Sequence, residues 1–432
     1  MHTLPWGALS ATDHVPPIRA AAPRQEYTCC KGATPRSGRA MPYTDYTTKV
    51  NDARRQHNIM VLVGNGFDIQ ALSDLNVRGD TKYTSFYYFL KSRSFNTRNL
   101  IYVQMSKLEA DGAENWSDVE GAIDRLNRAG TPIAAITDAM HEIQSEFGRF
   151  LDQLVTPSTL AQLSDQTVAY KMTLASLMEF LGDLGDPVEY SSMSLPAIAD
   201  IGDIYNFLFI NFNYTSMLDN YLYLDKTQFV PHPYIHSDRQ TDFHPNPRGH
   251  NVTLLGPRTK CERQGFSAAT YLATDILHPH GTQSTPRSLL FGIDPREDDK
   301  SGHELSKPYW AQNERKYADL FPDTNLFIIF GTSLGSTDRW WWLNILSTLQ
   351  RQDAQRPDIL IYWYNDTGTA TQASVRDRLI EASGLPATDE LRQAVTAQVR
   401  IILYDNTTPR AFLNTNPDLI PNWIHPNNQA KP

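Results

Sequence analysis

Continuous apolar runs of strand length recur along this chain, and they constrain its fold more than any other feature. Most of them lack the apolar–polar alternation of a strand with one wet face, and they match parallel strands that helices cover on both faces. Helical patterns separate the runs. We therefore predict an α/β fold with a doubly wound, mostly parallel sheet and a ligand site beyond the carboxyl ends of its strands. The expected strands are Ile59–Val63, Phe207–Phe212, Ser288–Phe291, Leu326–Phe330, Ile359–Tyr364 and Val399–Tyr404.

A helical segment is inserted after the first strand. Apolar residues from Ile133 to Leu154 are spaced alternately by three and four, which predicts an amphipathic helix. Helical character extends over residues 116–181, and we place the insertion at about residues 106–185. Further helices are expected over Arg339–Gln350, Ser374–Ser383 and Asp389–Gln398.

Composition sets the limits of the domain. Residues 1–57 are mostly rich in Pro, Ala and Arg and have no sustained period, which predicts a disordered N-terminal extension. The α/β domain is expected over residues 58–405, with a loop insertion at about 229–275 that is rich in Pro, Asn, Asp and His. Residues 406–432 form the expected C-terminal tail.

Charge, hydropathy and cysteine content exclude several classes of protein. The formal net charge of −9 argues against a general nucleic-acid binder. No apolar run reaches the roughly 18–20 residues that a membrane span needs. Cys29, Cys30 and Cys261 form neither a disulfide framework nor a C-x-x-C zinc site, which favours the cytoplasm.

The first expected strand ends in Gly64-Asn65-Gly66-Phe67-Asp68, where a helix begins. Two glycines allow a tight turn and the close approach of a ligand, and amides at a helix start attract an anion such as a pyrophosphate. The third glycine of the full dinucleotide fingerprint is missing. Asp68 would repel a phosphate unless it caps the helix or meets a ribose hydroxyl. A plain structural turn is an equal alternative.

Asn213-Tyr214-Thr215 follows the second apolar run, at the edge where an open α/β sheet presents residues to its ligand. The side-chain amide of Asn213 suits a sugar hydroxyl or a water molecule. The plainer interpretation is a turn asparagine that bonds its own backbone.

The third motif, His278-Pro279-His280-Gly281, precedes the run that ends near Asp294. Histidine titrates near neutrality and can take a proton from a sugar hydroxyl or water. A satisfied structural histidine is the plainer interpretation of His280. A metal bound by His278 and His280 lacks a third ligand of clear spacing, so we expect no metal.

The fourth motif, Gly331-Thr332-Ser333, ends another apolar strand, and Asp338 precedes a helix that contains Trp340–Trp342. Small hydroxyl side chains and amides at a strand end suit a ribose or an adenine. Alternatively, Ser336 or Asp338 is a helix N-cap and the tryptophans belong to the core. Both interpretations can hold.

A further cluster, Trp116-Ser117-Asp118-Val119-Glu120, carries two carboxylates. Ser117 and Glu120 have the spacing of a capping box. Asp118 and Glu120 do not share a helix face, so they are not expected to act as a pair. A place for Glu120 in a substrate pocket is the functional alternative.

In this order, GNGFD, FNYT, HPHG with FGID, and GTSLGSTD resemble the motifs of the AbiH family of bacterial abortive-infection proteins, and NWSDVE resembles another segment of that family. The likeness runs from about Ile59 to Tyr404. It implies a protein of phage defence.

The same series is remotely similar to the sirtuin-type, Rossmann-like NAD fold. That resemblance implies that Asn213 would orient the nicotinamide ribose or the attacking water and that His280 would be the general base. It also implies that the turn Gly64–Gly66 would hold the pyrophosphate and that Gly331–Ser333 would hold the adenosine half, with His280-Gly281 as the histidine motif.

The chain departs from the sirtuin pattern at three points. Thr215 stands in place of an aspartate, Asp68 stands in place of a small hydroxyl residue, and the paired C-x-x-C zinc module is missing. The missing module argues against a deacylase and favours the NAD-consuming hydrolases of phage defence.

These observations leave three hypotheses. The first is an enzyme that hydrolyses NAD to nicotinamide and ADP-ribose, because a cationic leaving group needs positioning, a dry site and a modest base. The second is a non-catalytic sensor that binds NAD, an ADP-ribose derivative or another nucleotide and switches a defence assembly. The third is a metal-dependent nuclease or toxin that uses Asp68, Glu120, Asp294 and Asp338. The expected partners are a small nucleotide, a phage-derived trigger and further copies of the chain, with neither membrane nor nucleic acid.

Overall fold

The computed structural model describes residues 43–48, 54–186, 189, 192–195, 203–224, 244–245, 271–293, 304–351 and 356–421. Most of the predicted extension over residues 1–57 and of the loop insertion at 229–275 lies outside the described residues. So do Asp294 and the end of the tail from residue 422.

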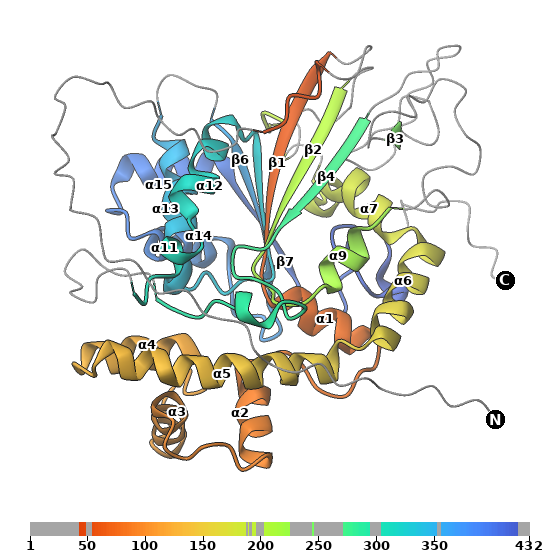
Figure 1. The fold of residues 1–432 in the computed structure, drawn as a ribbon. Helices are drawn as coiled ribbons and strands as arrows, with labels where there is room; N and C mark the ends of the chain where they lie inside the picture. The colour runs from red at the N-terminus through yellow and green to blue at the C-terminus, as the bar shows by residue number, and fades with distance from the viewer. Residues whose placement is uncertain are drawn as a thin grey trace, which may run out of the picture. The chain divides into compact units, whose positions relative to one another are not determined.

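The described residues contain a sheet with six parallel strands and a short antiparallel strand, β3, at one edge (Figure 1). The spatial order is β3-β4-β2-β1-β5-β6-β7. Without β3, the six strands follow the 3-2-1-4-5-6 order of doubly wound dinucleotide-binding folds, which confirms the predicted fold class. The strands are β1 (Arg55–Val63), β2 (Asp203–Asn211), β3 (His244–Pro245), β4 (Tyr271–Leu277), β5 (Leu326–Phe330), β6 (Asp358–Tyr364) and β7 (Val399–Tyr404).

Helices fill the connections between the strands. Those between β1 and β2 are α1 (Gly66–Asp74), α2 (Tyr83–Ser92), α3 (Leu100–Ala110), α4 (Val119–Arg128), α5 (Ile133–Leu154), α6 (Pro157–Tyr170), α7 (Met172–Glu179) and the 3-10 helix η1 (Phe180–Leu184). The later ones are α9 (Met217–Leu222), η2 (Pro286–Ser288), α11 (Lys307–Trp310), α12 (Asn313–Tyr317), η3 (Ala318–Asp323), η4 (Ser336–Asp338), α13 (Arg339–Leu349), α14 (Gln372–Ser383), α15 (Asp389–Gln398) and η5 (Pro417–Leu419). The helices predicted over residues 133–154, 339–350, 374–383 and 389–398 are confirmed. No helix in the described ranges has the length and hydropathy to cross a lipid bilayer.

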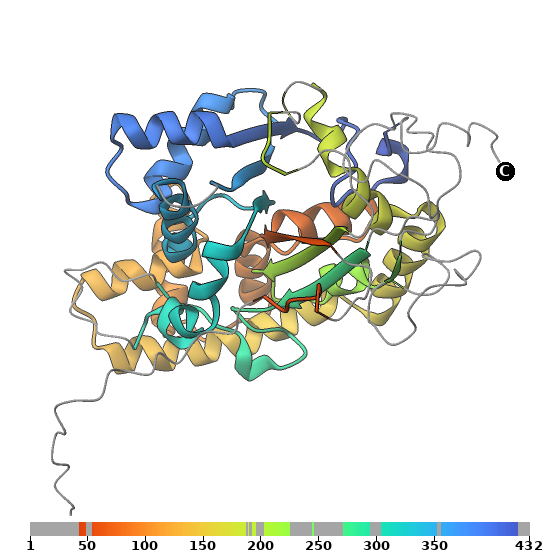
Figure 2. The same ribbon diagram turned by 90° about the horizontal axis from the view of Figure 1, so that it is seen from above.

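Strand β1 shows why the apolar runs are continuous. Ile59, Val61 and Val63 enter one hydrophobic core, whereas Met60 and Leu62 enter a second core on the other face. All five side chains are fully buried. Because neither face of the central strands meets water, alternation with polar residues is absent. Figure 2, the view from above, shows β1, β2 and β4 side by side.

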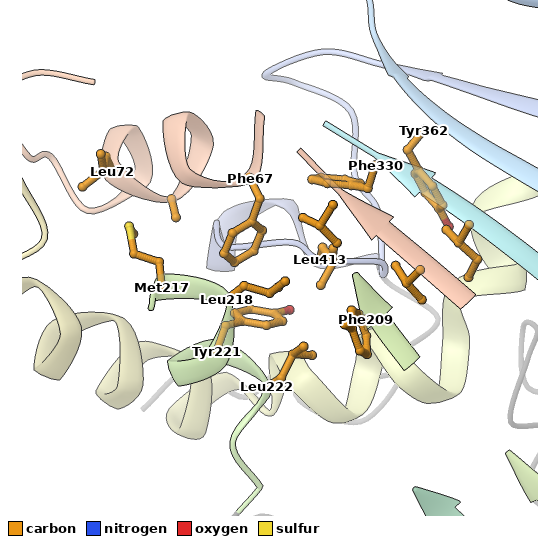
Figure 3. Packing of buried hydrophobic residues seen from close by; sticks show 14 of the residues in the cluster. Phe67, Leu72, Phe209, Met217, Leu218, Tyr221, Leu222, Phe330, Tyr362 and Leu413 are labelled. Carbon is orange, nitrogen blue, oxygen red and sulfur yellow. The ribbon is translucent and has the colours of Figure 1, made fainter. Parts of the chain in front are cut away.

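The first core reaches beyond the sheet to the helices at its end. Phe67 of α1 lies beside Tyr221 of α9, with ring centroids 5.5 Å apart (Figure 3). Phe330 of β5 and Leu413 of the C-terminal segment belong to the same core. Phe67 is therefore a core residue that fixes α1 against the sheet.

The prediction of a strand over Ser288–Phe291 is wrong. That segment ends the 3-10 helix η2 and continues as a loop. The strand beside β2 is β4, which lies within and just after the region assigned to a loop insertion. Its apolar signal is weak because Thr274 is half-buried and Asp275 is exposed. Leu289 and Phe291 are apolar for another reason, since both are buried in the first core.

The helical block, defined as α2 to α5, packs on loops at the carboxyl ends of the strands (Figure 1). The ring of Phe147 on α5 lies 5.3 Å from that of Tyr214 after β2 and 5.2 Å from that of Phe291 after β4. The Gln144 side chain also donates a hydrogen bond to the carbonyl of Leu289 at 2.6 Å. The block therefore contacts the end of the sheet at which α/β proteins bind ligands.

The loops after β1 and β5 touch through their backbones. The amide of Gly64 donates to the carbonyl of Phe330 at 2.9 Å, and the amide of Gly66 donates to the carbonyl of Gly331 at 2.8 Å. A Cβ atom on Gly66 would lie 2.6 Å from the Cα of Gly331, which itself has a φ of +65°. Glycine is required here by close approach as well as by conformation.

We predict that Gly331→Ala lowers the free energy of unfolding by about 2–4 kcal/mol, since the new Cβ would combine a strained φ with a 2.9 Å contact to the Phe67 amide nitrogen. Gly368→Ala is the matched control, because Gly368 has a φ of +67° and open space around it. It should lose only about 1–2 kcal/mol. Urea unfolding measures both. Equal losses would show that the loop contact does not require glycine.

Candidate functional site

Four loops leave the sheet at one level, beside the point where the strand order reverses. Val63 pairs with Asn211 and with Phe330, and Ile210 pairs with Leu277. The loops that begin at Gly64, Phe212, His278 and Gly331 are therefore neighbours, and we call them the switch-point edge. Open α/β sheets bind ligands at this position. The sheet thus brings the four sequence motifs together.

Asn213 has a buried side chain with no partner. It is 3% exposed, and neither its carboxamide nitrogen nor its oxygen has a hydrogen-bond partner among the described residues. The predicted alternative, a turn asparagine, applies instead to Asn211, whose Oδ1 accepts the backbone amide of Asn213 at 3.0 Å. Buried polar groups are nearly always paired, and an unpaired one costs about 1–3 kcal/mol. The hydrogen-bonding capacity of the Asn213 carboxamide is therefore unused within the described residues.

His280 lies beside the segment that carries Asn213. Its ring stacks on Phe212 with centroids 5.0 Å apart and lies 6.3 Å from the ring of Tyr214. The ring also hydrogen-bonds the backbone of Phe212. Nε2 is 3.4 Å from Oδ1 of Asp338. Burial, and then the nearby Lys307 ammonium, lower the pKa of His280 to about 3, so at neutral pH the imidazole is uncharged and keeps a lone pair.

Lys307 is a site residue that the sequence does not reveal. Its ammonium lies 2.9 Å from Oε1 of Glu120 and 3.0 Å from Oδ1 of Asp338, and its side chain is 4% exposed. Burial opposes the charge of Lys307, but the two carboxylates raise its pKa above the ordinary value. The only sequence signal is Ser306, which caps α11 and marks a helix start rather than a buried charge.

The two carboxylates differ in charge. Burial raises the pKa of both, but Lys307 and His280 outweigh it at Asp338 and hold the pKa of that carboxyl below its usual range. At Glu120 burial prevails over Lys307 and raises the pKa to about 7. We call Glu120, His280, Lys307 and Asp338 the charge cluster. At neutral pH it contains a lysine cation, an aspartate anion, a neutral imidazole and a glutamate whose raised pKa favours protonation.

The predicted capping roles at the charge cluster are wrong. Asp118, not Ser117, caps α4, because its Oδ1 accepts the Glu120 amide at 3.1 Å. The hydroxyl of Ser117 instead bonds that of Thr84 at 2.9 Å. Asp338 precedes α13 without forming a side-chain cap. Both Glu120 and Asp338 turn to Lys307 instead.

Asp68 also turns inward. It is 1% exposed, and the hydroxyl of Thr215 donates to its Oδ2 at 2.7 Å. Burial raises its pKa to about 7, although the Thr215 bond favours the ionised form. Asp68 therefore neither caps α1 nor faces a phosphate as a full charge at neutral pH. Its Oδ1 has no hydrogen-bond partner in the described part of the chain.

The predicted phosphate grip is largely occupied by the protein itself. The amides of Gly64 and Gly66 bond the loop after β5, and the side chain of Asn65 donates to the carbonyl of Thr81 at 3.0 Å. The Oγ1 atom of Thr332 is buried and unpartnered among the described residues.

The remaining predicted binding residues are Gly281 and Ser333. Gly281 has a φ of +83° and touches the carbonyl of Ser288 so closely that a Cβ would lie 2.0 Å from it. It therefore serves the turn that carries His280. Ser333 is exposed.

The residues considered as metal ligands have other partners. His278 pairs with Asp219 at 2.9 Å, whereas His280 faces Asp338. Glu120 and Asp338 share the Lys307 ammonium. Over the ranges that the structure describes, no three His, Cys, Asp or Glu side chains are grouped as metal ligands.

Strand order defines the class as doubly wound, Rossmann-like α/β proteins. The family model described as "Bacteriophage abortive infection AbiH" matches residues 60–357, more than half of the chain, and the chain belongs to this family. It is thus a protein of phage defence by abortive infection, as its motifs predict. No curated protein and no solved structure matches the chain. The sirtuin-like NAD fold stays a prediction.

The buried carboxyl of Asp68 predicts a pH-dependent stability. Its pKa is about 7 in the folded protein and 3.8 in its ordinary state, so the folded state binds the proton more tightly. Its contribution is full below about pH 4 and is lost as the pH rises through 7. Asp68→Asn cannot ionise. Relative to the parent, it should gain about 2–4 kcal/mol between pH 4 and pH 8.

Urea unfolding of both proteins at the two pH values measures this gain. Thr215→Val provides the matched contrast, because it removes the bond that favours the ionised form and should make the loss of stability with pH steeper. A difference between Asp68→Asn and the parent that does not change with pH would contradict the assignment.

Proposed function

We propose that the protein hydrolyses the nicotinamide–ribose bond of NAD and releases nicotinamide and ADP-ribose, with Asn213 and His280 at the reacting sugar. The observation that carries the proposal is the buried, unpartnered carboxamide of Asn213 at the switch-point edge. The residues on either side of it, Phe212 and Tyr214, both contact the ring of the neutral His280.

The chemistry balances with these two side chains. As the bond between C1′ and the pyridinium nitrogen breaks, its electron pair neutralises the pyridinium, and nicotinamide leaves without a general acid. A water molecule attacks C1′ of the cation-like sugar. The lone pair of His280 accepts the proton of that water, and Asp338, 3.4 Å from Nε2, stabilises the imidazolium.

A weak base suffices for this step because the sugar is strongly electrophilic by the time water attacks. Asn213 can donate to or accept from a ribose hydroxyl or the attacking water, since a carboxamide has both kinds of atom. Its fixed position supplies the orientation on which such catalysis depends.

We assign the rest of NAD to the neighbouring loops of the switch-point edge. In this assignment the loops after β1 and β5 border the ligand. The amides of Gly64 and Gly66, and the space beside Gly64, Gly66 and Gly331, are used between these two loops. The Thr332 hydroxyl is a buried donor for the adenosine or pyrophosphate side. Ser333 offers a second, exposed hydroxyl.

The pair formed by Asp68 and Thr215 supports the likeness to sirtuin-type NAD sites. These two positions are where the chain departs from that pattern, with a carboxylate in place of a hydroxyl and a hydroxyl in place of a carboxylate. They bond each other at 2.7 Å. The two departures therefore compensate, and the same pair of groups remains at the edge in exchanged positions.

We predict that the purified protein, in its activated state, converts NAD to nicotinamide, and that Asn213→Ala and His280→Ala each reduce the rate by at least about 100-fold. Chromatographic measurement of nicotinamide and ADP-ribose follows the reaction. His141→Ala, at an exposed position of α5, is the control and should keep the parent rate. Equal NAD loss in the parent and in both site variants would reject these catalytic roles.

A sensor gives a different result in the same samples. Calorimetry would then detect NAD or ADP-ribose binding to the parent and weaker binding to Asn213→Ala, without any release of nicotinamide. With that outcome, the proposed function of the site would be nucleotide recognition and not NAD hydrolysis.

A further inference from the structure

Lys307 connects three segments that are distant in the chain. Its ammonium bridges Glu120 of the helical block and Asp338 before α13. Its backbone is fixed by a third segment, because its amide donates to the carbonyl of Ile293 at 2.9 Å, and Ile293 donates to Leu305 at 2.9 Å. A Cβ on Gly292 would lie 3.0 Å from Cγ of Lys307, so the stem of this side chain is closely packed too.

We propose that Lys307 is a positioning residue for His280, holding Asp338 beside the imidazole and tying the helical block to the switch-point edge through Glu120. In this view α4 is part of the site. The inference deepens the proposed function, on which it rests for the identity of His280 as the base. The contacts and burial of Lys307 do not depend on which substrate is bound.

The geometry supports a role beyond packing. Lys307 has two carboxylate partners, and they come from separate elements. One of them, Asp338, has the same oxygen atom, Oδ1, 3.0 Å from Nζ of Lys307 and 3.4 Å from Nε2 of His280. Lys307 thus fixes the position of that oxygen, and the charge of the oxygen acts on the imidazole of His280.

The charges around His280 show in which direction Lys307 shifts the pKa of the imidazole. The charged groups that shift the pKa of His280 are Lys307, which lowers it, and Asp338, which raises it. Behind them, Glu120 and Asp118 of α4 and the phenol of Tyr214 face Lys307 or its partners. Tyr83 of α2 adjoins Tyr214 and the same carboxylates. Removing Lys307 would leave His280 beside an uncompensated Asp338 and favour the imidazolium.

Lys307→Gln tests the inference through the ring signals of His280, which can be assigned by their absence in His280→Ala. In the parent, His280 should stay neutral from pH 5 to 8. In Lys307→Gln, its titration should move upward from about 3 by about one to two pH units, so that protonation of the ring begins to show at the acid end of that range. Glu120→Gln should leave His280 neutral, because the lysine charge is retained. The acid limb of the pH profile of kcat/KM for NAD should move upward with Lys307→Gln only.

Lys307→Gln leaves two buried carboxylates without a cation, which can prevent folding. A second variant keeps the test decisive in that case. The double variant Lys307→Gln with Glu120→Gln removes one of these carboxylates and still leaves Asp338 beside His280. It should show the same upward shift of the His280 titration. An unchanged His280 titration in every folded variant that lacks Lys307 would overturn the inference and leave the lysine a purely structural role.

The two proposals fail separately. Absence of NAD hydrolysis by the parent would reject the proposed function, yet the His280 titration would still report on Lys307. Hydrolysis by the parent with no shift of that titration would reject the role of Lys307 alone.

Discussion

A lysine ammonium buried between two carboxylates is the interaction on which the candidate site depends. Removing water from three ionisable groups is costly, and the arrangement is stable only because each carboxylate meets the cation at about hydrogen-bond distance, 2.9 and 3.0 Å. The bridge joins the helical block to loops of the sheet. Its lysine also adds to burial in keeping the neighbouring His280 uncharged at neutral pH. The same lysine therefore holds these elements together and lowers the pKa of His280.

The sheet supplies the place for this cluster. The chain builds β1, β2 and β4 in one direction from the centre and β5, β6 and β7 in the other, so the loops after β1 and β5 diverge at the switch point. Glycines let those loops touch through their backbones before they diverge. Family membership assigns the chain to phage defence by abortive infection. In the function that we propose, the unpartnered buried carboxamide and the neutral imidazole at this edge recognise or cleave a nucleotide sugar.

Local patterns predict most of the fold, because strands buried on both faces and helices with one apolar stripe each produce a distinct hydrophobic pattern in the sequence. The central strands β1 and β5 and the helix α5 are of this kind. The strand β4 escapes prediction because Thr274 and Asp275 dilute its apolar run. For the site, motif order predicts that Asn213, His280 and Asp338 lie at one edge. Lys307 is not predicted as a site residue, since the sequence around residue 307 does not show that its partners are Glu120 and Asp338. The roles of neighbours such as Ser117 and Asp118 depend on side-chain directions that spacing does not determine.

The central claim is that the unpartnered carboxamide of Asn213 and the ring of His280 meet one nucleotide sugar. A crystal structure of the protein with bound NAD, or with ADP-ribose if NAD is consumed, tests it most directly. The account predicts that the ribose next to the nicotinamide lies within hydrogen-bond distance of the Asn213 carboxamide, with the His280 imidazole on the side from which water attacks C1′. A nucleotide bound at another surface, with Asn213 still unpartnered in its complex, would contradict the account.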